Sequence, residues 1–144
     1  MTVDRSEIPY WECSTLLHEQ RIGRLCIVDG GYPIAVPVNF RFVSDGGEAK
    51  VVVRVGNDTM LGRYEGWASL ECDHLDLIQG QAWSVIARGA LRRVIGGHNL
   101  VDPQPLLDNR HRWLTLQVAM LSGRRFEFPP TIAGHLLDWS PTSD

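Results

Sequence analysis

Apolar residues along this chain follow a helical period near the N-terminus and an alternating period over most of the rest. The helical stripe consists of Tyr10, Cys13 and Leu17 at the i, i+3, i+7 spacing, with Leu16 beside them. This stripe predicts a helix of about three turns that ends near Gln20 or Arg21. Pro9 suits the first turn of such a helix, and Ser6 is a candidate N-cap.

The alternating segments predict β-strands separated by tight turns. Runs of β-branched and aromatic residues that alternate with polar ones are typical of half-buried strands. They cover residues 23–28, 34–43, 49–55, 68–72, 82–95, 113–118 and 124–128. Asp29-Gly30-Gly31 and Ser122-Gly123 are turn signals between strands, and the polar residues 73–80 predict a loop.

A short helix and two irregular strand positions interrupt the alternation. Asp58 or Thr59 is expected to cap a helix that runs to about Glu65. Pro37 lies inside a strand but has no N–H for a ladder, so it marks an edge, a bulge or an interruption. Gly89 predicts a bulge or bend in the longest strand.

These elements favour a mainly β fold of one domain. One helix, six or seven strands and a short central helix, mostly joined by hairpin-length turns, indicate an antiparallel barrel or sandwich. The 144 residues fit a single domain over residues 1–144, with a core at about 10–128 and a tail at 129–144. Hydrophobic and charged shares of 44% and 22% are ordinary for a globular protein.

The charge balance excludes two classes of partner. The net charge is −3, with 14 basic against 17 acidic residues, whereas nucleic-acid binders usually carry a basic excess. Lys50 is the only lysine, so a polylysine patch for a membrane surface is not expected. No window approaches the roughly 18 apolar residues of a membrane span, and the first residues show no signal-peptide pattern.

The cysteines predict a reducing compartment. Cys13, Cys26 and Cys72 are odd in number, widely spaced and without a CxxC pair, so they predict neither a disulfide framework nor a zinc ribbon. Cys26 and Cys72 lie in apolar runs, where a free cysteine is expected to be a small core residue. The expected location is the cytoplasm.

Motifs for common chemistries are missing. The chain contains no GxGxxG, Walker A, HExxH or GxSxG pattern. Its five histidines are dispersed, and His74 with Asp73 and Asp76 is only a weak metal-type cluster. No side chain stands out as an acid or base, so we predict neither a catalytic residue nor a metal ligand.

Three local features could bind a cofactor. Arg54 ends a strand and Thr59 opens the next helix, which suits a phosphate because a helix N-terminus and a guanidinium both attract anions. Trp83 could line the pocket of a flat aromatic ligand, and the hydroxyl of Ser84 could form a hydrogen bond with a heteroatom at the ligand's edge. The segment Pro37-Val38-Asn39 offers backbone groups that a regular ladder would occupy. The alternatives are an ordinary capped helix with a surface arginine and a core tryptophan.

Taken in order, these pieces resemble the pyridoxamine 5′-phosphate oxidase-like flavin-binding split-barrel superfamily, in particular its small actinobacterial-type and nitroimidazole-resistance members. The likeness covers about residues 10–128. It is carried by Arg21-Ile22-Gly23-Arg24-Leu25, Pro37-Val38-Asn39-Phe40, Arg54, Asp58-Thr59, Leu70-Glu71-Cys72-Asp73, Ala82-Trp83-Ser84-Val85, Arg88-Gly89 and Ser122-Gly123-Arg124-Arg125.

The resemblance implies a six-stranded antiparallel split barrel of the Greek-key type with flanking short helices. Members usually form homodimers with the flavin at the interface, FMN being the common cofactor and the deazaflavin F420 an alternative. Arg54 and Thr59 match the phosphate-binding segment of the family. Pro37-Val38-Asn39 matches the segment along the flavin ring, and Trp83-Ser84 matches the pair that closes the pocket.

The chain departs from the family pattern after this threonine. Met60 stands where a lysine is common, and Asp58 replaces a glycine, so a cation is lost and a negative charge is added. Arg63 shares a helix face with Thr59 at the i+4 spacing. We expect Arg63 to replace the lysine, which makes Asp58, Met60 and Arg63 part of the candidate site.

The resemblance favours an FMN-binding oxidoreductase that acts on an unidentified small molecule. One alternative is an F420-dependent reductase, in which Arg24, Arg124 and Arg125 would meet the anionic tail of the cofactor. A second alternative is a non-enzymatic flavin or haem binder, or a degenerate barrel without a cofactor. The lost lysine favours this last reading more than in a typical member.

Overall fold

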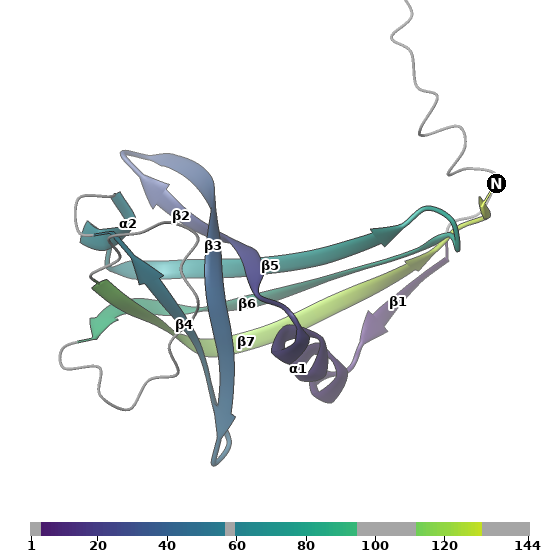
Figure 1. The fold of residues 1–144 in the computed structure, drawn as a ribbon, viewed down its shortest axis with the longest axis horizontal. Coiled ribbons are helices and arrows are strands. Elements are labelled where there is room, and N and C mark those ends of the chain that lie inside the picture. Colours follow the sequence, from purple (N-terminus) through teal and green to yellow (C-terminus); the bar gives the residue numbers. More distant parts are fainter. Residues whose placement is uncertain (1–3, 57–59, 95–111, 131–144) are drawn as a thin grey trace, which may run out of the picture.

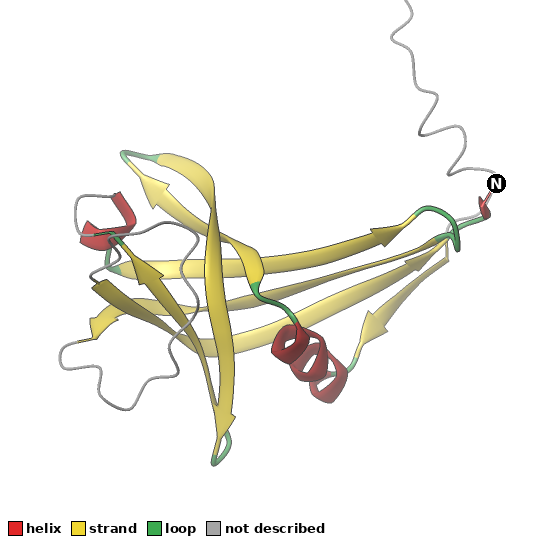
Figure 2. Cartoon of the chain, viewed as in Figure 1, coloured by secondary structure: helices red, strands yellow, loops and turns green. Residues whose placement is uncertain are grey.

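The computed structural model describes residues 4–56, 60–94 and 112–130. Within them the chain forms β1 (Asp4–Ile8), α1 (Tyr10–Glu19), β2 (Ile22–Asp29), β3 (Tyr32–Asp45), β4 (Glu48–Val55), α2 (Met60–Arg63), β5 (Gly66–Asp76), β6 (Gln81–Val94) and β7 (Arg112–Glu127). Figure 1 traces these elements in chain order, and Figure 2 separates strands from helices. Neither of the two helices in these ranges is long and apolar enough to cross a membrane.

Six of the strands close into an antiparallel barrel. The neighbours around it are β2, β3, β4, β7, β6 and β5, and β5 pairs with β2 again. β7 thus returns beside β4 after the β5–β6–β7 hairpins, which is a Greek-key connection. Following the pairs once around the barrel leads from Ser84 back to β6 at Val94, a shift of ten residues. The strands are therefore strongly tilted, and the predicted mainly β split barrel is confirmed.

The barrel is split where β3 changes its partner. Residues Tyr32–Asn39 pair with β2, whereas Phe40–Asp45 pair with β4. At the change, the backbone N–H of Phe40 donates to the carbonyl of Arg21 at 2.9 Å. We call the point between Asn39 and Phe40 the fork. Pro37 lies in the part of β3 that has β2 as its only strand partner among the described residues, so of the three predicted options it marks an edge.

The N-terminal prediction was right for the helix and wrong for what precedes it. α1 begins after Pro9, which is the N-cap, and ends at Glu19. No side chain caps the helix, and Ser6 lies instead in β1, opposite Arg125 of β7. β1 was missed because four of its five side chains are exposed, so it shows no apolar alternation.

One predicted turn is continuous strand, and one predicted loop is shorter than expected. β5 extends to Asp76, so the loop predicted at residues 73–80 is reduced to the turn at residues 77–80, and β7 runs straight through Ser122-Gly123. Both strands are held by β6, which pairs with them along its length. Gly123 is present for packing rather than for a turn, because a Cβ there would lie 2.8 Å from the sulfur of Cys13.

Gly89 lies at a bulge, as predicted. The β6–β7 register shifts between Arg88, opposite Met120, and Gly89, opposite Val118. Ala119 is consequently the extra residue of β7. A Cβ on Gly89 would lie 1.7 Å from the carbonyl oxygen of Gln117, so only glycine fits.

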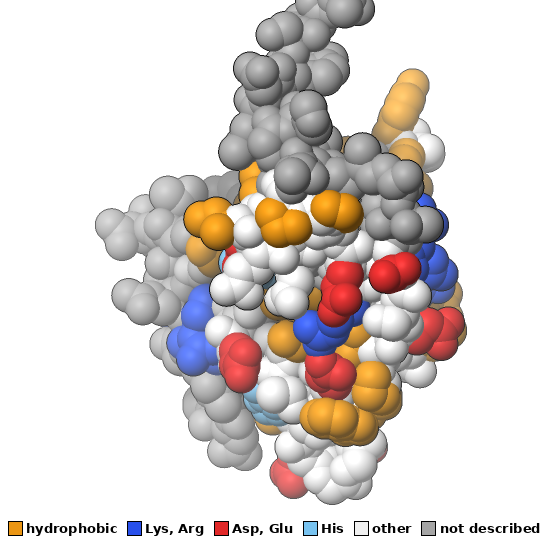
Figure 3. All heavy atoms as spheres, turned by 90° about the vertical axis from the view of Figure 1, so that its right-hand side faces the viewer, with side chains coloured by type: hydrophobic (Ala, Val, Ile, Leu, Met, Phe, Trp, Pro, Cys, Tyr) orange, Lys and Arg blue, Asp and Glu red, His pale blue; other side chains and the backbone are white. Residues whose placement is uncertain are grey.

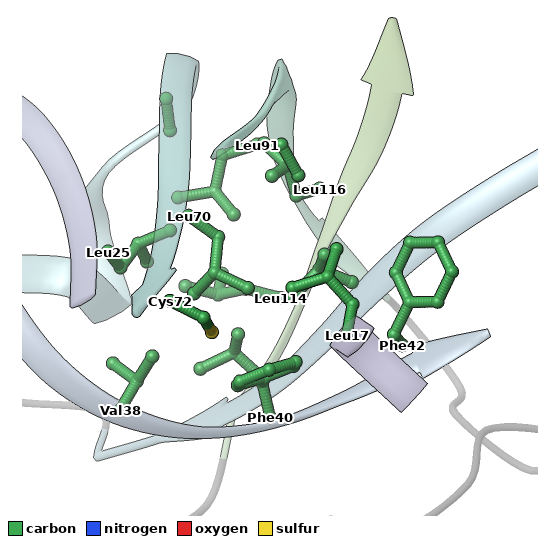
Figure 4. Close-up of a cluster of buried hydrophobic side chains, with 14 of the residues drawn as sticks. Leu17, Leu25, Val38, Phe40, Phe42, Leu70, Cys72, Leu91, Leu114 and Leu116 are labelled. Atoms are coloured by element: carbon green, nitrogen blue, oxygen red, sulfur yellow. The ribbon is translucent and has the colours of Figure 1, made fainter. Parts of the chain in front are cut away.

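The core fills the barrel and the space under α1 (Figure 4). Its fully buried side chains come from every barrel strand and from α1: Leu17, Leu25, Phe40, Val51, Val53, Leu70, Val85, Leu91, Leu114 and Leu116. Cys72 belongs to this core, as predicted, and burial raises the pKa of its thiol to about 12. The same prediction for Cys26 was wrong, because Cys26 is half-buried and lines a groove on the outer face of the barrel.

Candidate functional site

The fork brings two of the predicted site residues to the same level of the outer face. Val38 and Phe40 of β3 are buried. Asn39 between them and Pro37 before them therefore face outward. Arg54 faces outward for the same reason, because Val53 and Val55 on either side are buried. One step beyond the last β3–β4 pair, Phe40 with Val53, Asn39 and Arg54 lie on neighbouring strands.

Arg54 is oriented by an aromatic ring. Its guanidinium carbon lies 5.8 Å from the centroid of the Trp113 ring, and Trp113 is its cross-strand partner on β7. A cation over a ring face gains roughly 0.5–1 kcal/mol at exposed sites, which favours this direction of the side chain. The fork therefore presents an oriented cation beside an amide side chain.

α2 follows Arg54 along the chain and divides its side chains between core and surface. Leu61 and Gly62 are buried, and Met60 is partly buried against the core cluster. Met60 therefore packs against the core, and Arg63, which is exposed, is the cationic residue of this helix. Asp58 and Thr59 lie outside the described residues.

Trp83 and Ser84 project to opposite faces of β6. Trp83 packs against the core side, opposite Arg125 and His74, whose ring lies 6.5 Å from it. Ser84 lies on the outer face, opposite Arg124 and Asp73. Successive residues of a strand alternate in direction, so the two side chains cannot line one surface within a single chain.

Ser84 and Asn39 are joined by a row of residues across the outer face. Asn39 pairs with Ile22 on β2, and the β2–β5 register places Asp73 level with Ile22 and opposite Ser84. Three strand spacings of ~4.8 Å separate Asn39 from Ser84, or ~14 Å along the sheet. We call the strip from Arg54 through Asn39 to Ser84 the outer band. It unites Pro37, Asn39, Arg54 and Ser84, and it excludes Val38 and Trp83.

An ion-pair cluster that the sequence patterns did not single out lies in the middle of this band. Arg24 donates from Nε to Glu71 Oε2 at 2.6 Å and from NH2 to Asp73 Oδ2 at 2.7 Å. Burial, together with a hydrogen bond that protonated Glu71 donates to Asp73, raises the pKa of Glu71. The cluster forms through the cross-strand register of β2 and β5, and no local motif in the sequence reveals that register.

The arginines expected to meet an F420 tail are mostly engaged within the chain. Arg24 holds two carboxylates, and Arg125 forms an ion pair with Glu12 of α1. Arg124 remains on the outer face, in a hollow of about 420 Å³. Figure 3 shows the end of the molecule at the right of Figure 1, where acidic and basic side chains lie next to each other among separate hydrophobic ones. No positive surface stands out there.

The weak metal-type cluster is dispersed by the strand. Asp73 faces Arg24, whereas the neighbouring His74 faces Trp83. Among the described residues, no group of three or more His, Cys, Asp and Glu side chains is arranged to hold a metal ion.

Comparisons with known proteins agree with this architecture. The FAD-binding protein from Mycobacterium smegmatis has a TM-score of 0.68 and 25% identity, over 86% of this chain and 100% of that one. An FAD-binding protein from Mesorhizobium loti has a TM-score of 0.69 and 20% identity, over 88% of this chain and all of the other. The FAD and haem binding protein from M. smegmatis has a TM-score of 0.63 and 14% identity, over 94% of this chain and 80% of that one.

The sequence comparison gives the family. No curated protein sequence matches the chain. The family model described as pyridoxamine 5′-phosphate oxidase matches residues 11–125, which is most of the chain and contains every strand of the barrel up to β7. With its split barrel and this match, the chain belongs to the pyridoxamine 5′-phosphate oxidase family.

Proposed function

We propose that this protein binds a flavin, FMN in the first instance, on the outer band and acts as a flavin-dependent oxidoreductase. The observation that carries the proposal is the fork, where Asn39 and Arg54 lie level with each other on neighbouring strands of the outer face, beside an edge of β3. The FAD-binding protein that shares 25% of its sequence with this chain supports a flavin.

The residues at the fork have distinct parts in this proposal. Arg54 would hold the phosphate of the cofactor, with Arg63 as a second cation and Thr59 as a hydroxyl donor. Asn39 would bond the polar rim of the ring, because its amide both donates and accepts. The edge of β3 beside Pro37 would offer backbone groups to the same rim. The bound flavin would supply hydride transfer, and the side chains would bind and orient it.

The partner of this site is proposed to be a second copy of the chain, with the flavin between the two. Trp83 supports this arrangement. In one chain it faces away from the outer band, and it can meet a flavin there only when it comes from another copy.

An absorption spectrum and a titration with FMN test the proposal. The purified protein should be yellow, or it should quench the fluorescence of added FMN. The dissociation constant should be micromolar or lower, which corresponds to a binding free energy of about 8 kcal/mol. Parallel titrations with F420 and haem test the alternative cofactors. Failure of all three would favour the barrel without a cofactor.

A matched pair of arginine variants ties the binding to the fork. Arg54→Met should weaken FMN binding at least tenfold, because a charge-assisted hydrogen bond contributes about 1.5–3 kcal/mol. Arg5 is the matched control. Its guanidinium also lies over an aromatic ring, 6.0 Å from the centroid of Phe126, but Arg5 belongs to β1 and not to the outer band. Equal losses in Arg54→Met and Arg5→Met would contradict the proposed site.

A further inference from the structure

The outer face carries a second hollow that the flavin site does not use. It is an apolar groove of about 550 Å³ on β2, β5, β6 and β7, with walls that include Cys26, Val28, Trp67 and Met120. Trp67 is 75% exposed and Met120 59%. Large apolar side chains gathered around a concave surface usually mark a binding site, and this volume lies within the range of small-molecule pockets.

The groove continues into a polar hollow of about 420 Å³. The two hollows meet at Arg88, which lines both of them. Beyond Arg88 the polar hollow is lined by Ser84, Ser122 and Arg124, with Glu7 as its acidic residue. Arg88 and Arg124 form no ion pair within the described part of the chain. An anion would complement these two cations.

The spacing along β6 suits one ligand with two chemically different ends. Trp67 is opposite Ala90 and Arg88 is two residues further on, which is ~7 Å along the strand. Ser84 lies another four residues away, ~13 Å at the same rise. An acid group at Arg88 therefore leaves its apolar body beside Trp67 and Met120.

We propose that this double hollow binds an amphipathic carboxylic acid, with the carboxylate on Arg88 and the aliphatic or aryl part in the apolar groove. Its role as the substrate rests on the proposed flavin function, because Ser84 is shared between the polar hollow and the outer band. The binding itself does not depend on that function.

Calorimetric titration of the full chain with decanoate, and with decanol as its uncharged counterpart, tests the proposal. Decanoate should bind at least tenfold more tightly than decanol. Arg88→Met should remove this preference and leave decanol binding unchanged, because the apolar stem is kept. Trp67→Ala should weaken both ligands. Trp11→Ala is the matched control, since Trp11 is 68% exposed but lies on α1, and it should alter neither.

Several outcomes would overturn the proposal. Equal affinity for the acid and the alcohol would show that Arg88 does not bind the carboxylate. Equal losses of affinity in Trp67→Ala and Trp11→Ala would show that the apolar groove is not the binding site. If decanoate does not bind and Trp67→Ala instead changes the sedimentation of the protein, the face is covered by a second copy. FMN titration of the same variants separates this result from the flavin proposal, because Trp67 and Arg88 lie outside the outer band.

Discussion

At the scale of single residues, Arg63 tests whether the chain compensates for its missing lysine. Met60 packs against the core, so Arg63 is the exposed cation of α2. Arg63→Ala should weaken FMN binding by about tenfold, the lower end for a hydrogen bond to a charged group. Fluorescence titration measures this loss, with Arg92→Ala on β6 as an exposed arginine control. An unchanged FMN affinity would assign the phosphate to Arg54 alone.

The carboxyl group of Glu71 predicts a dependence of stability on pH. Burial and a hydrogen bond that its protonated form donates to Asp73 raise its pKa, against a weaker opposing effect of Arg24. The folded protein therefore holds this proton more tightly than the unfolded chain, in which a glutamate carboxyl has a pKa of ~4.3. The resulting stabilisation is fully present below that pKa and is lost as the pH rises through the folded pKa.

Glu71→Gln isolates this contribution, because glutamine resembles the protonated acid at every pH. Urea unfolding from pH 4 to pH 7 should show that wild type loses stability relative to Glu71→Gln as the pH rises. A constant difference between the two proteins across that range would mean that Glu71 titrates alike in both states.

At the scale of elements, the bulge at Gly89 is the sharpest constraint. Gly89→Ala should destabilise the protein by ~3 kcal/mol, the upper end for overpacking, because the added carbon meets a backbone oxygen rather than a movable side chain. Thermal unfolding measures the loss. Ser69→Ala, on the strand opposite Arg88, keeps the ladder and should change the melting temperature little. A melting temperature for Gly89→Ala equal to that of Ser69→Ala would contradict the tight bulge.

The helix and the strands show what local sequence can and cannot predict. The alternation of residues 34–43 and 49–55 gave the middle of β3 and β4, and the stripe from Tyr10 to Leu17 gave α1. The pair Ser122-Gly123 has identical local chemistry in a turn and in a strand. Only the partner strand β6 and the approach of Cys13 decide between them.

At the scale of the whole molecule, the site is a product of strand register. Asn39, Arg24, Glu71 and Ser84 lie on four strands, and a shift of one residue in any pairing would turn one of them inward. The sequence therefore indicated the residue types through the family pattern. It could not reveal that Ser84 shares a face with Asn39 while Trp83 does not.

This separation of Trp83 from the outer band gives a prediction about assembly. If the flavin lies between two copies, Asn39 of one copy and Trp83 of the other serve the same site. Asn39→Ala and Trp83→Ala should then each weaken FMN binding when alone. Mixing the two variants under conditions that exchange subunits should restore tight binding, because a mixed dimer contains one site with both residues intact and one with neither.

The expected stoichiometry makes the experiment quantitative. Random exchange between equal amounts makes about half of the dimers mixed, and each has one intact site of two, so about a quarter of all sites should bind FMN as wild type does. Fluorescence titration of the mixture measures this fraction, with Asn39→Ala alone at the same total concentration as the control. A mixture that binds no better than its components would place both residues in the site of one chain, or Trp83 in no site at all. If Trp83 belongs to no site, the two faces of β6 have separate tasks, the outer one for ligands and the inner one for packing against the core.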